Sequence, residues 1–323
     1  MAKLLEYNAT LIKRVDITPK LAIFRVKPDD GVPGEGAWFT PGQYMVIGLN
    51  NEKQPELGRV QRPMSIASEP EQRDFIDFYI RYVDHPESDN PLTHLLWDIQ
   101  EGARMYARVR PTGKFTIKDT MGEDDPRVRI YLAAGTGLAP FLSIVESQYR
   151  NDPDVDLSNT VMIHGASYSA DLGYRERMLE LAEKTGMKYL PTVSRTHIDT
   201  GWKGASGRAE DWFKAERLGE LERLIGLPEG GLHPGAAQVL ICGLQGTIGM
   251  TVQRLLPRGF IPDNRKIRRA LDIPEKLHPD VYYEAYDTTP PIDLDDAPLV
   301  ASLKNDLAAG LAYRERMAAQ SAS

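Results

Sequence analysis

The sequence is poor in the residues that form disulfides and metal clusters. Cys242 is the one cysteine among 323 residues, which excludes an intrachain disulfide and any all-cysteine zinc or iron–sulfur site. The six histidines show no metal-ligand spacing, so we predict no metal. No run approaches the roughly 18 apolar residues of a membrane span, and the N-terminal MAKLLEYNATLIKRVD is too polar for a secretory signal. We therefore expect a soluble, cytoplasmic protein.

Positive charge is also in short supply. The chain has 39 Lys and Arg against 46 Asp and Glu, a net charge of −7, which argues against nucleic acid as a partner. Hydrophobic residues make up 41% and charged residues 26%, the balance of a globular protein. At about 150 residues per domain, the length predicts two domains with buried cores.

The first part of the chain has the pattern of an antiparallel barrel. Short strands separated by Gly/Pro turns are predicted at 21–26, 43–49, 75–83 and 105–109, with a helix over 91–100. Within 75–83, Asp77, Tyr79 and Arg81 alternate with apolar residues, which predicts one face free for ligand contacts. We predict a β-barrel domain over residues 1–122.

After an acidic turn at 121–126 the pattern alternates between strands and helices. This β-then-α/β order predicts a doubly wound parallel sheet over residues 123–286. An acidic, proline-bearing linker and a helix with a leucine stripe follow as a third segment, 287–323. The predicted strands are 128–133, 160–164, 188–193 and 238–241, and the predicted helices are 140–149, 174–184, 210–225, 249–256 and 297–319.

The most informative stretch is the glycine loop after the first strand of the second domain. A buried strand leads into Gly135, Thr136 and Gly137, and Pro140 lies near the start of the next helix. Glycines permit a sharp turn, and a helix N-terminus offers free N–H groups to a pyrophosphate. The same residues suit a tight strand–helix turn without a ligand, so the loop alone leaves both open. It lacks the Lys-Ser/Thr of an NTPase loop and the third glycine of a dinucleotide fingerprint.

Together with two further motifs, this loop resembles the ferredoxin–NADP reductase family, particularly its bacterial branch. The motifs are Arg62-Pro63-Met64-Ser65 and Cys242-Gly243, the latter at the end of what we expect to be the last strand. The resemblance spans most of residues 5–286 and implies a barrel that binds FAD and an α/β domain that binds NADP(H). Members move electrons between NADP(H) and ferredoxin or flavodoxin. They need a flavin because nicotinamide gives up two electrons as a hydride, while these carriers exchange one.

The resemblance implies a flavin site built mainly on the barrel. Arg62 would face the FAD pyrophosphate, and Met64 and Ser65 would border the flavin ring, with Ser65 near its N5 atom. Met64 stands where the family usually has a tyrosine, and a thioether cannot stack or donate as tyrosine does. Thr93 looks like the N-cap of a helix that holds FAD phosphate. The other implied flavin neighbours are Pro63, Tyr79, Ile80, Arg81, Leu92, Thr136, Tyr282 and Tyr283.

For the nicotinamide side, the resemblance places Cys242 against the ring and adds Gly243 to the residues that bind the cofactor. It also implies three catalytic candidates, Ser65, Cys242 and Glu284. By residue type alone, Cys242 is equally well a small buried apolar side chain, and no His/Asp partner supports a nucleophile. Recognition of the NADP 2′-phosphate would fall to Ser167, Arg195 and Arg208, with Ser167 standing where bacterial members often have arginine. We favour NADP(H) and keep NADH as an alternative. His164, on a buried strand, is expected to be a satisfied core residue.

Partner choice leaves several alternatives. Acidic carriers would need a local basic face, for which the candidates are Arg265, Lys266, Arg268 and Arg269, or Arg104, Arg108 and Arg110, although such runs also occur as ordinary solvated surface. One alternative function is a reductase component or electron-transfer subunit of a larger enzyme such as an oxygenase, whose iron–sulfur cluster would sit on a separate protein. Another is a flavin-binding sensor, which would not need the nucleotide loop. We expect 287–323 to pack on the body or on a second subunit near the flavin or nucleotide entrance, which leaves an oligomer open.

Overall fold

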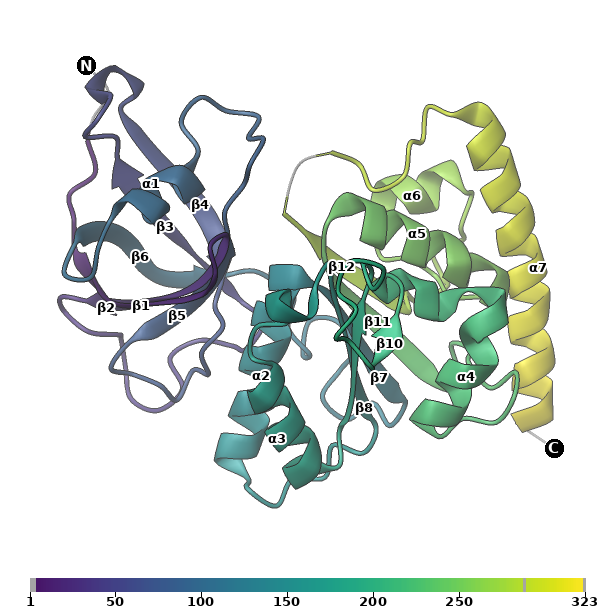
Figure 1. Cartoon of the computed structure of the whole chain (residues 1–323). Coiled ribbons are helices and arrows are strands. Elements are labelled where there is room, and N and C mark those ends of the chain that lie inside the picture. The colour runs from purple at the N-terminus through teal and green to yellow at the C-terminus, as the bar shows by residue number, and fades with distance from the viewer. Residues whose placement is uncertain (1–3, 287–288, 322–323) are drawn as a thin grey trace. The chain divides into compact units, whose positions relative to one another are not determined.

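The computed structural model describes residues 4–286 and 289–321 and divides the chain into two compact units (Figure 1). The first unit comprises Met1–Asp119 and Leu138–Pro153, and the second comprises Thr120–Gly137 and Asp154–Ser323. The division of the chain at residues 122 and 286 remains a prediction.

The first unit is built on a six-stranded antiparallel sheet in the order β4-β3-β6-β1-β2-β5. Its two end strands are joined by a bridge between Ile66 and Phe78, which closes the sheet into a barrel around an apolar interior. The predicted barrel is confirmed. The elements of this unit are β1 (Ala9–Thr18), β2 (Leu21–Pro28), β3 (Tyr44–Asn50), η1 (Pro55–Leu57), β4 (Arg59–Ser65), β5 (Ile76–Arg81), α1 (Leu92–Asp98), β6 (Arg104–Thr112) and α2 (Leu138–Asn151).

The alternation expected in β5 is only partly present. Asp77 and Tyr79 are buried, and Arg81 is the one exposed residue of the strand. Asp77 accepts two hydrogen bonds from the guanidinium of Arg25, both at 2.9 Å, and this ion pair allows its carboxylate to be buried. The prediction that this face is free for ligand contacts is therefore wrong at Asp77.

The second unit contains a six-stranded parallel sheet in the order β10-β9-β8-β7-β11-β12, as predicted for a doubly wound domain. Its three central strands, β8, β7 and β11, are buried almost throughout, the pattern of a parallel sheet covered on both faces. The elements are β7 (Val128–Ala134), η2 (Gly135–Gly137), β8 (Thr160–Ala166), η3 (Ser169–Asp171), α3 (Arg175–Thr185), β9 (Lys188–Val193), β10 (Ala205–Ser206), η4 (Ala209–Phe213), α4 (Ala215–Ile225), β11 (Ala237–Gly243), α5 (Gln245–Leu255), η5 (Leu256–Arg258), α6 (Arg265–Ala270), β12 (Val281–Ala285) and α7 (Ala297–Ser321).

Two sequence predictions about this unit are wrong. The strand that carries Cys242 is not the last, because β12 pairs in parallel with β11 outside it. The helix predicted over 210–225 is two elements, η4 and α4. The break falls at Lys214, whose backbone is extended with φ −67° and ψ 145°.

The C-terminal helix α7 folds back onto the second unit, where it lies against η5 (Figure 1). Leu303 and Leu307 are buried as the leucine stripe predicted, and Gly310 lies so close to η5 that a Cβ there would be 1.9 Å from the carbonyl oxygen of Leu256. The expectation that the extension packs on the body is thus confirmed. Residues 287–288, at the start of that predicted segment, lie outside the described residues.

The extension 287–323 is expected near the flavin or nucleotide entrance, and for the C-terminal half of α7 the nucleotide entrance is wrong. Arg314 pairs with Asp280 at 2.7 Å, and Tyr313 donates a hydrogen bond to the carbonyl of Gly230. Asp280 immediately precedes β12 and Gly230 lies in the loop before β11, so these contacts are at the amino edge of the parallel sheet. Nucleotides bind such sheets at the opposite, carboxyl edge. The start of the extension differs, because Pro291 packs against Gly249 in the first half of α5, which follows the carboxyl end of β11.

Candidate functional site

The glycine loop lies at the point in the second unit where the strand order reverses. β7 has β8 on one side and β11 on the other, and the crevice beyond the carboxyl ends of such strands is the usual ligand site of this fold. Gly135 has a φ of +57°, which favours glycine, and a Cβ there would meet open space. At Gly137 a Cβ would lie 2.0 Å from the carbonyl oxygen of Cys242. Only glycine therefore lets the loop approach β11 so closely, and Pro140 follows in the first turn of α2.

Cys242, Thr136 and Tyr286 meet at this edge. The Cys242 side chain is fully buried, and its thiol donates to the hydroxyl oxygen of Tyr286 at 3.5 Å. The Tyr286 hydroxyl also hydrogen-bonds the side chain of Thr136. Burial, together with the nearby Glu284 carboxylate, raises the pKa of the Cys242 thiol well above its ordinary value. The thiol therefore stays protonated, in keeping with its not being a nucleophile.

Sequence reasoning missed Tyr286. The register pairs Cys242 with Glu284, which places Glu284 beside the thiol on the neighbouring strand. Tyr283 instead packs against the hydrophobic core, and the Tyr282 hydroxyl donates to the Pro279 carbonyl, before the strand begins. Burial raises the pKa of both of these tyrosines to about 12. The signal for Tyr286 was present in VYYEAY, as a third tyrosine two residues beyond Glu284.

His164 lies in the same row of the sheet as Cys242, with Ala133 between them. It is fully buried, and its Nδ1 is 3.0 Å from the hydroxyl oxygen of Tyr189. Burial lowers the pKa of the imidazole to about 4, so the ring is neutral at physiological pH. The backbone of Gly135, in the glycine loop, also interacts with the ring and opposes part of this effect of burial on the pKa. The expectation of a buried core histidine with polar partners is confirmed.

The three residues expected at a 2′-phosphate all lie beyond the carboxyl edge of this sheet. The backbone N–H of Arg195 donates to the carbonyl of Ser167 at 3.1 Å, which joins the loops after β9 and β8. Arg208 precedes η4, and its guanidinium is 3.8 Å from the Glu210 carboxylate. Both arginine side chains are exposed.

The residues expected at the flavin lie mostly on the end strands β4 and β5 of the first unit. Arg62 is exposed on β4, and among the described residues its guanidinium makes one hydrogen bond, to the carbonyl of Gln61 at 2.8 Å. Pro63 is tolerated there because β4 is an end strand. Met64 packs partly against the barrel core and Ser65 is buried at the end of the strand. On β5, Tyr79 and Ile80 are buried, and Arg81 is exposed.

Thr93 does not cap α1. The helix begins at Leu92 after Pro91, which has a φ of −77° and makes no side-chain cap. The Thr93 hydroxyl instead accepts from the backbone N–H of Val83 at 3.4 Å, and the residue is buried. The prediction of an N-cap is wrong because proline sets the helix start and the threonine serves the preceding loop.

In each of the two predicted basic runs, one arginine is bound to other residues of the protein. Arg104 pairs with Asp29 at 2.6 Å, and Arg268 donates to the carbonyls of Pro274 and Leu277. Arg265, Lys266 and Arg269 are exposed.

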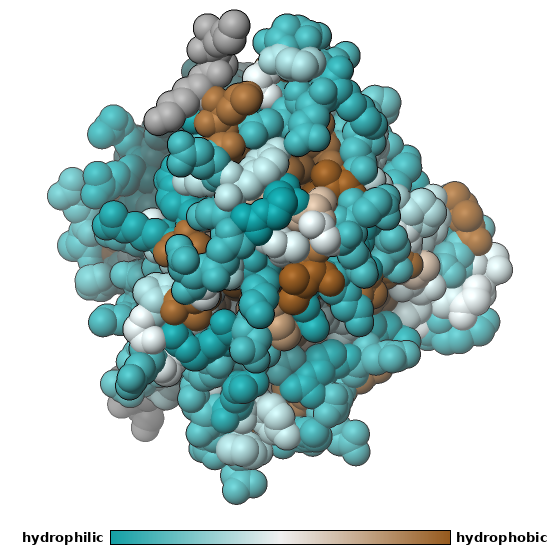
Figure 2. Space-filling view, turned by 90° about the vertical axis from the view of Figure 1, so that its left-hand side faces the viewer, coloured by the Kyte–Doolittle hydropathy of each residue, from teal (hydrophilic) through white to brown (hydrophobic). Residues whose placement is uncertain are grey.

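In Figure 2 the face turned to the viewer is largely hydrophilic, with hydrophobic residues in small patches. No extended apolar docking surface is visible on that face.

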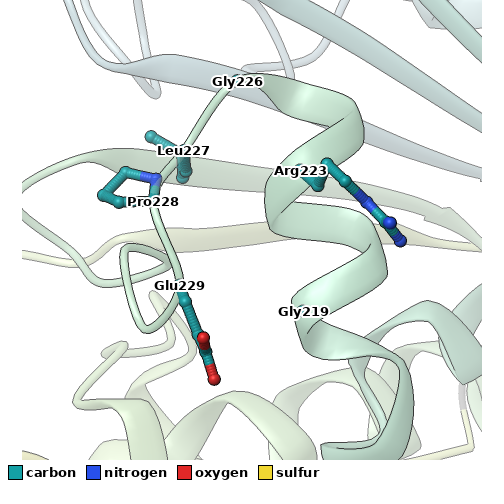
Figure 3. A pocket seen from close by; sticks show the side chains of 6 residues that line it. All are labelled: Gly219, Arg223, Gly226, Leu227, Pro228 and Glu229. Carbon is teal, nitrogen blue, oxygen red and sulfur yellow. The ribbon is translucent and has the colours of Figure 1, made fainter.

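The described residues also bear on metal binding, membrane insertion and one surface hollow. Across residues 4–286 and 289–321, no three His, Cys, Asp or Glu side chains are placed to hold a metal ion. No helix within those ranges has the length and apolar character needed to cross a membrane. A surface hollow beside α4 and the turn after it contains none of the predicted site residues (Figure 3); it is lined by Gly219, Arg223, Gly226, Leu227, Pro228 and Glu229.

Comparison with known proteins identifies the family. Residues 131–253 match the model described as "Oxidoreductase NAD-binding domain". The chain is 31% identical to the ferredoxin–NADP reductase of Azotobacter vinelandii over 217 residues, which cover 64% of this chain and 73% of that protein. The chain belongs to the ferredoxin–NADP reductase family.

Two further similarities agree with this assignment. The flavodoxin/ferredoxin–NADP reductase of Escherichia coli (strain K12) is 30% identical over 208 residues, or 64% of this chain and 74% of that protein. A crystal structure of a ferredoxin NADP+ reductase from Neisseria gonorrhoeae, with bound FAD and NADP, matches with a TM-score of 0.65 and 22% identity. That match covers 89% of this chain and all of the other, and it establishes the shared fold.

Proposed function

We propose that this protein is an FAD-containing oxidoreductase that moves electrons between NADP(H) and a one-electron carrier, ferredoxin or flavodoxin. The barrel unit would bind FAD and the α/β unit the nicotinamide nucleotide. The observation that carries the proposal is the close approach of Gly137 to the backbone of Cys242, which brings the glycine loop, the buried thiol and Tyr286 together at the strand-order reversal. Membership of the family supports the same conclusion.

The residues of the barrel fit an FAD pyrophosphate. Arg62 offers an exposed guanidinium that no carboxylate neutralises among the described residues, and a forked cation of this kind suits a pyrophosphate. Bound FAD would supply the conversion between hydride transfer and single-electron transfer. Ser65, at the end of the same strand, would place a hydroxyl at the flavin N5 position, and Met64 would pack against the ring.

The α/β unit would bind and orient the nicotinamide nucleotide. A Cβ at Gly135 would meet open space, so the backbone N–H groups of the loop can approach a pyrophosphate there. Cys242 would border the nicotinamide as an uncharged group that excludes water. Glu284, beside it, would provide a carboxylate able to exchange a proton.

Absorption spectroscopy of the purified protein tests the proposal. The protein should be yellow, should bleach anaerobically on adding NADPH, and should then reduce ferredoxin or flavodoxin. Arg62→Ala should weaken FAD binding by about ten- to a hundredfold, the loss of a charged hydrogen bond. Arg59→Ala, an exposed arginine at the start of the same strand, is the matched control.

Two outcomes would contradict the proposal in different ways. A protein without flavin affinity would overturn it entirely. A flavoprotein that is bleached by NADPH but reduces neither carrier would refute the proposed acceptor and favour the reductase-component alternative.

A further inference from the structure

Two loops beyond the carboxyl edge of the second unit's sheet are fixed to each other. The Arg195 N–H donates to the Ser167 carbonyl at 3.1 Å, and the Ser169 N–H donates to the Asp199 carboxylate at 2.5 Å. Residues that are distant in the sequence are thereby held in one arrangement before any ligand binds. Such preorganisation lowers the entropy cost of binding.

The Arg195 side chain is held by a phenol. Its Nη1 donates to the Tyr168 hydroxyl at 2.8 Å, and its guanidinium carbon lies 5.3 Å from the centre of the Tyr168 ring. Among the described residues it makes no ion pair, and the nearby Asp199 carboxylate is engaged by Ser169. Because a phenol is neutral, Arg195 is oriented without losing its positive charge. Its other N–H donors remain for an anion.

Arg208 is in a different electrostatic environment. Its guanidinium lies 3.8 Å from the Glu210 carboxylate, whose side chain is only 3% exposed. A carboxylate that is removed from water acts strongly on a neighbouring charge, so it offsets part of the attraction that Arg208 would exert on an anion. The Arg208 side chain is also 71% exposed, which leaves it less constrained.

We propose that Tyr168 is a positioning residue. It holds Arg195, one of the two arginines that the family resemblance assigns to the adenosine 2′-phosphate, so that Arg195 contributes more than Arg208 to the preference for NADPH over NADH. This inference rests on the proposed function, since it requires a nicotinamide nucleotide in the second unit. An arginine near the carboxyl edge of a dinucleotide-binding sheet can accommodate that phosphate. The fork of Arg195 can form two hydrogen bonds to it, which offsets the lack of a cation at Ser167.

Calorimetric binding of two nucleotides that differ only in the 2′-phosphate tests the inference without turnover. The probes are adenosine 2′,5′-bisphosphate and adenosine 5′-monophosphate. Tyr168→Phe should weaken binding of the bisphosphate about three- to tenfold, because it removes one hydrogen bond to a charged group, and should leave the monophosphate unchanged. Arg195→Ala should weaken the bisphosphate about ten- to a hundredfold, and Arg208→Ala by less. Tyr313→Phe, which also removes a tyrosine hydroxyl but lies in α7, is the matched control.

Three results would overturn the inference. The first is a Tyr168→Phe variant whose preference for the bisphosphate is unchanged. The second is a Tyr168→Phe variant that loses affinity equally for both probes. The third is a larger loss of bisphosphate affinity in Arg208→Ala than in Arg195→Ala. Wild-type protein that binds both probes equally would also refute it, while leaving the proposed function intact. Wild-type protein that binds neither probe and is not reduced by NADPH or NADH would refute the proposed function itself.

Discussion

The buried imidazole of His164 should make the stability of the protein depend on pH in a defined direction. Burial lowers its pKa from 6.5 to about 4 in the folded protein. The unfolded chain takes up this proton near pH 6.5, so between the two pKa values the unfolded state binds more protons than the folded state. The free energy of unfolding must therefore fall as the pH falls through this range.

The magnitude follows from the two pKa values. Between about pH 7.5 and about pH 5, the difference in proton uptake at His164 should lower the free energy of unfolding by about 2 kcal/mol. His164→Asn removes the titrating group, so the variant should lose about 2 kcal/mol less than the wild type over the same interval. Urea denaturation followed by circular dichroism at several pH values measures this difference. The comparison is between slopes and does not depend on the overall stability of the variant.

The control for this experiment is His85→Asn, which removes an exposed histidine. This control should keep the pH dependence of the wild type. Equal pH dependence in His164→Asn and the wild type would refute the reasoning, because the imidazole would then titrate alike in both states.

Three further predictions concern the glycine loop, the thiol and α7. Gly137→Ala would place a Cβ 2.0 Å from the Cys242 carbonyl oxygen, so we expect loss of flavin bleaching by NADPH at unchanged FAD content; normal bleaching would contradict the tight approach. Cys242 should resist iodoacetamide in the folded protein and react in urea, as measured by mass spectrometry, because its thiol is buried with a raised pKa; rapid labelling of folded protein would argue against this. Arg314→Met should lower the free energy of unfolding by about 2 kcal/mol, because Asp280 is buried and loses one cationic partner. Arg316→Met should change it little in the same denaturation assay, and equal effects would contradict the role assigned to the ion pair.

The sheet of the second unit could be predicted because its signals are local. Buried parallel strands are short, mainly apolar runs, and such a run was recognisable at β7, β8 and β11. β12 was not predicted as a strand because its central residues, Tyr282 to Glu284, combine aromatic and charged side chains. β12 is the edge strand of the sheet and is held there by its pairing with β11, which does not depend on a continuous apolar run.

The two errors in the first unit have different origins. The alternation around Asp77 predicted an open polar face, but Arg25, on the neighbouring strand β2, neutralises the carboxylate. Thr93 has the residue type of an N-cap, yet Pro91 sets the helix start. The first error came from a contact distant in sequence, whereas the second came from a proline only two residues before the threonine.

The candidate site shows the same division between local and distant signals. The glycine loop was identified from adjacent residues, because its backbone geometry requires glycine. The contact of Cys242 with Tyr286 joins residues 44 positions apart, and that of Arg195 with Tyr168 joins residues 27 positions apart. No pattern within either segment predicts these pairs, so only the folded sheet shows them.

The second unit separates its stabilising contacts from its candidate chemistry along the strands. α7 is fastened at the amino edge of the sheet, where Arg314 meets Asp280, whereas the glycine loop, Cys242 and Arg195 lie at the carboxyl edge. β12 runs from one edge to the other. Asp280 comes directly before its first residue, and Glu284, near its end, lies beside Cys242 on β11. The Tyr168–Arg195 contact lies on the loops after β8 and β9, on the side of β7 away from β12. The two ends of the sheet can then be tested independently, by unfolding at one and by nucleotide binding at the other.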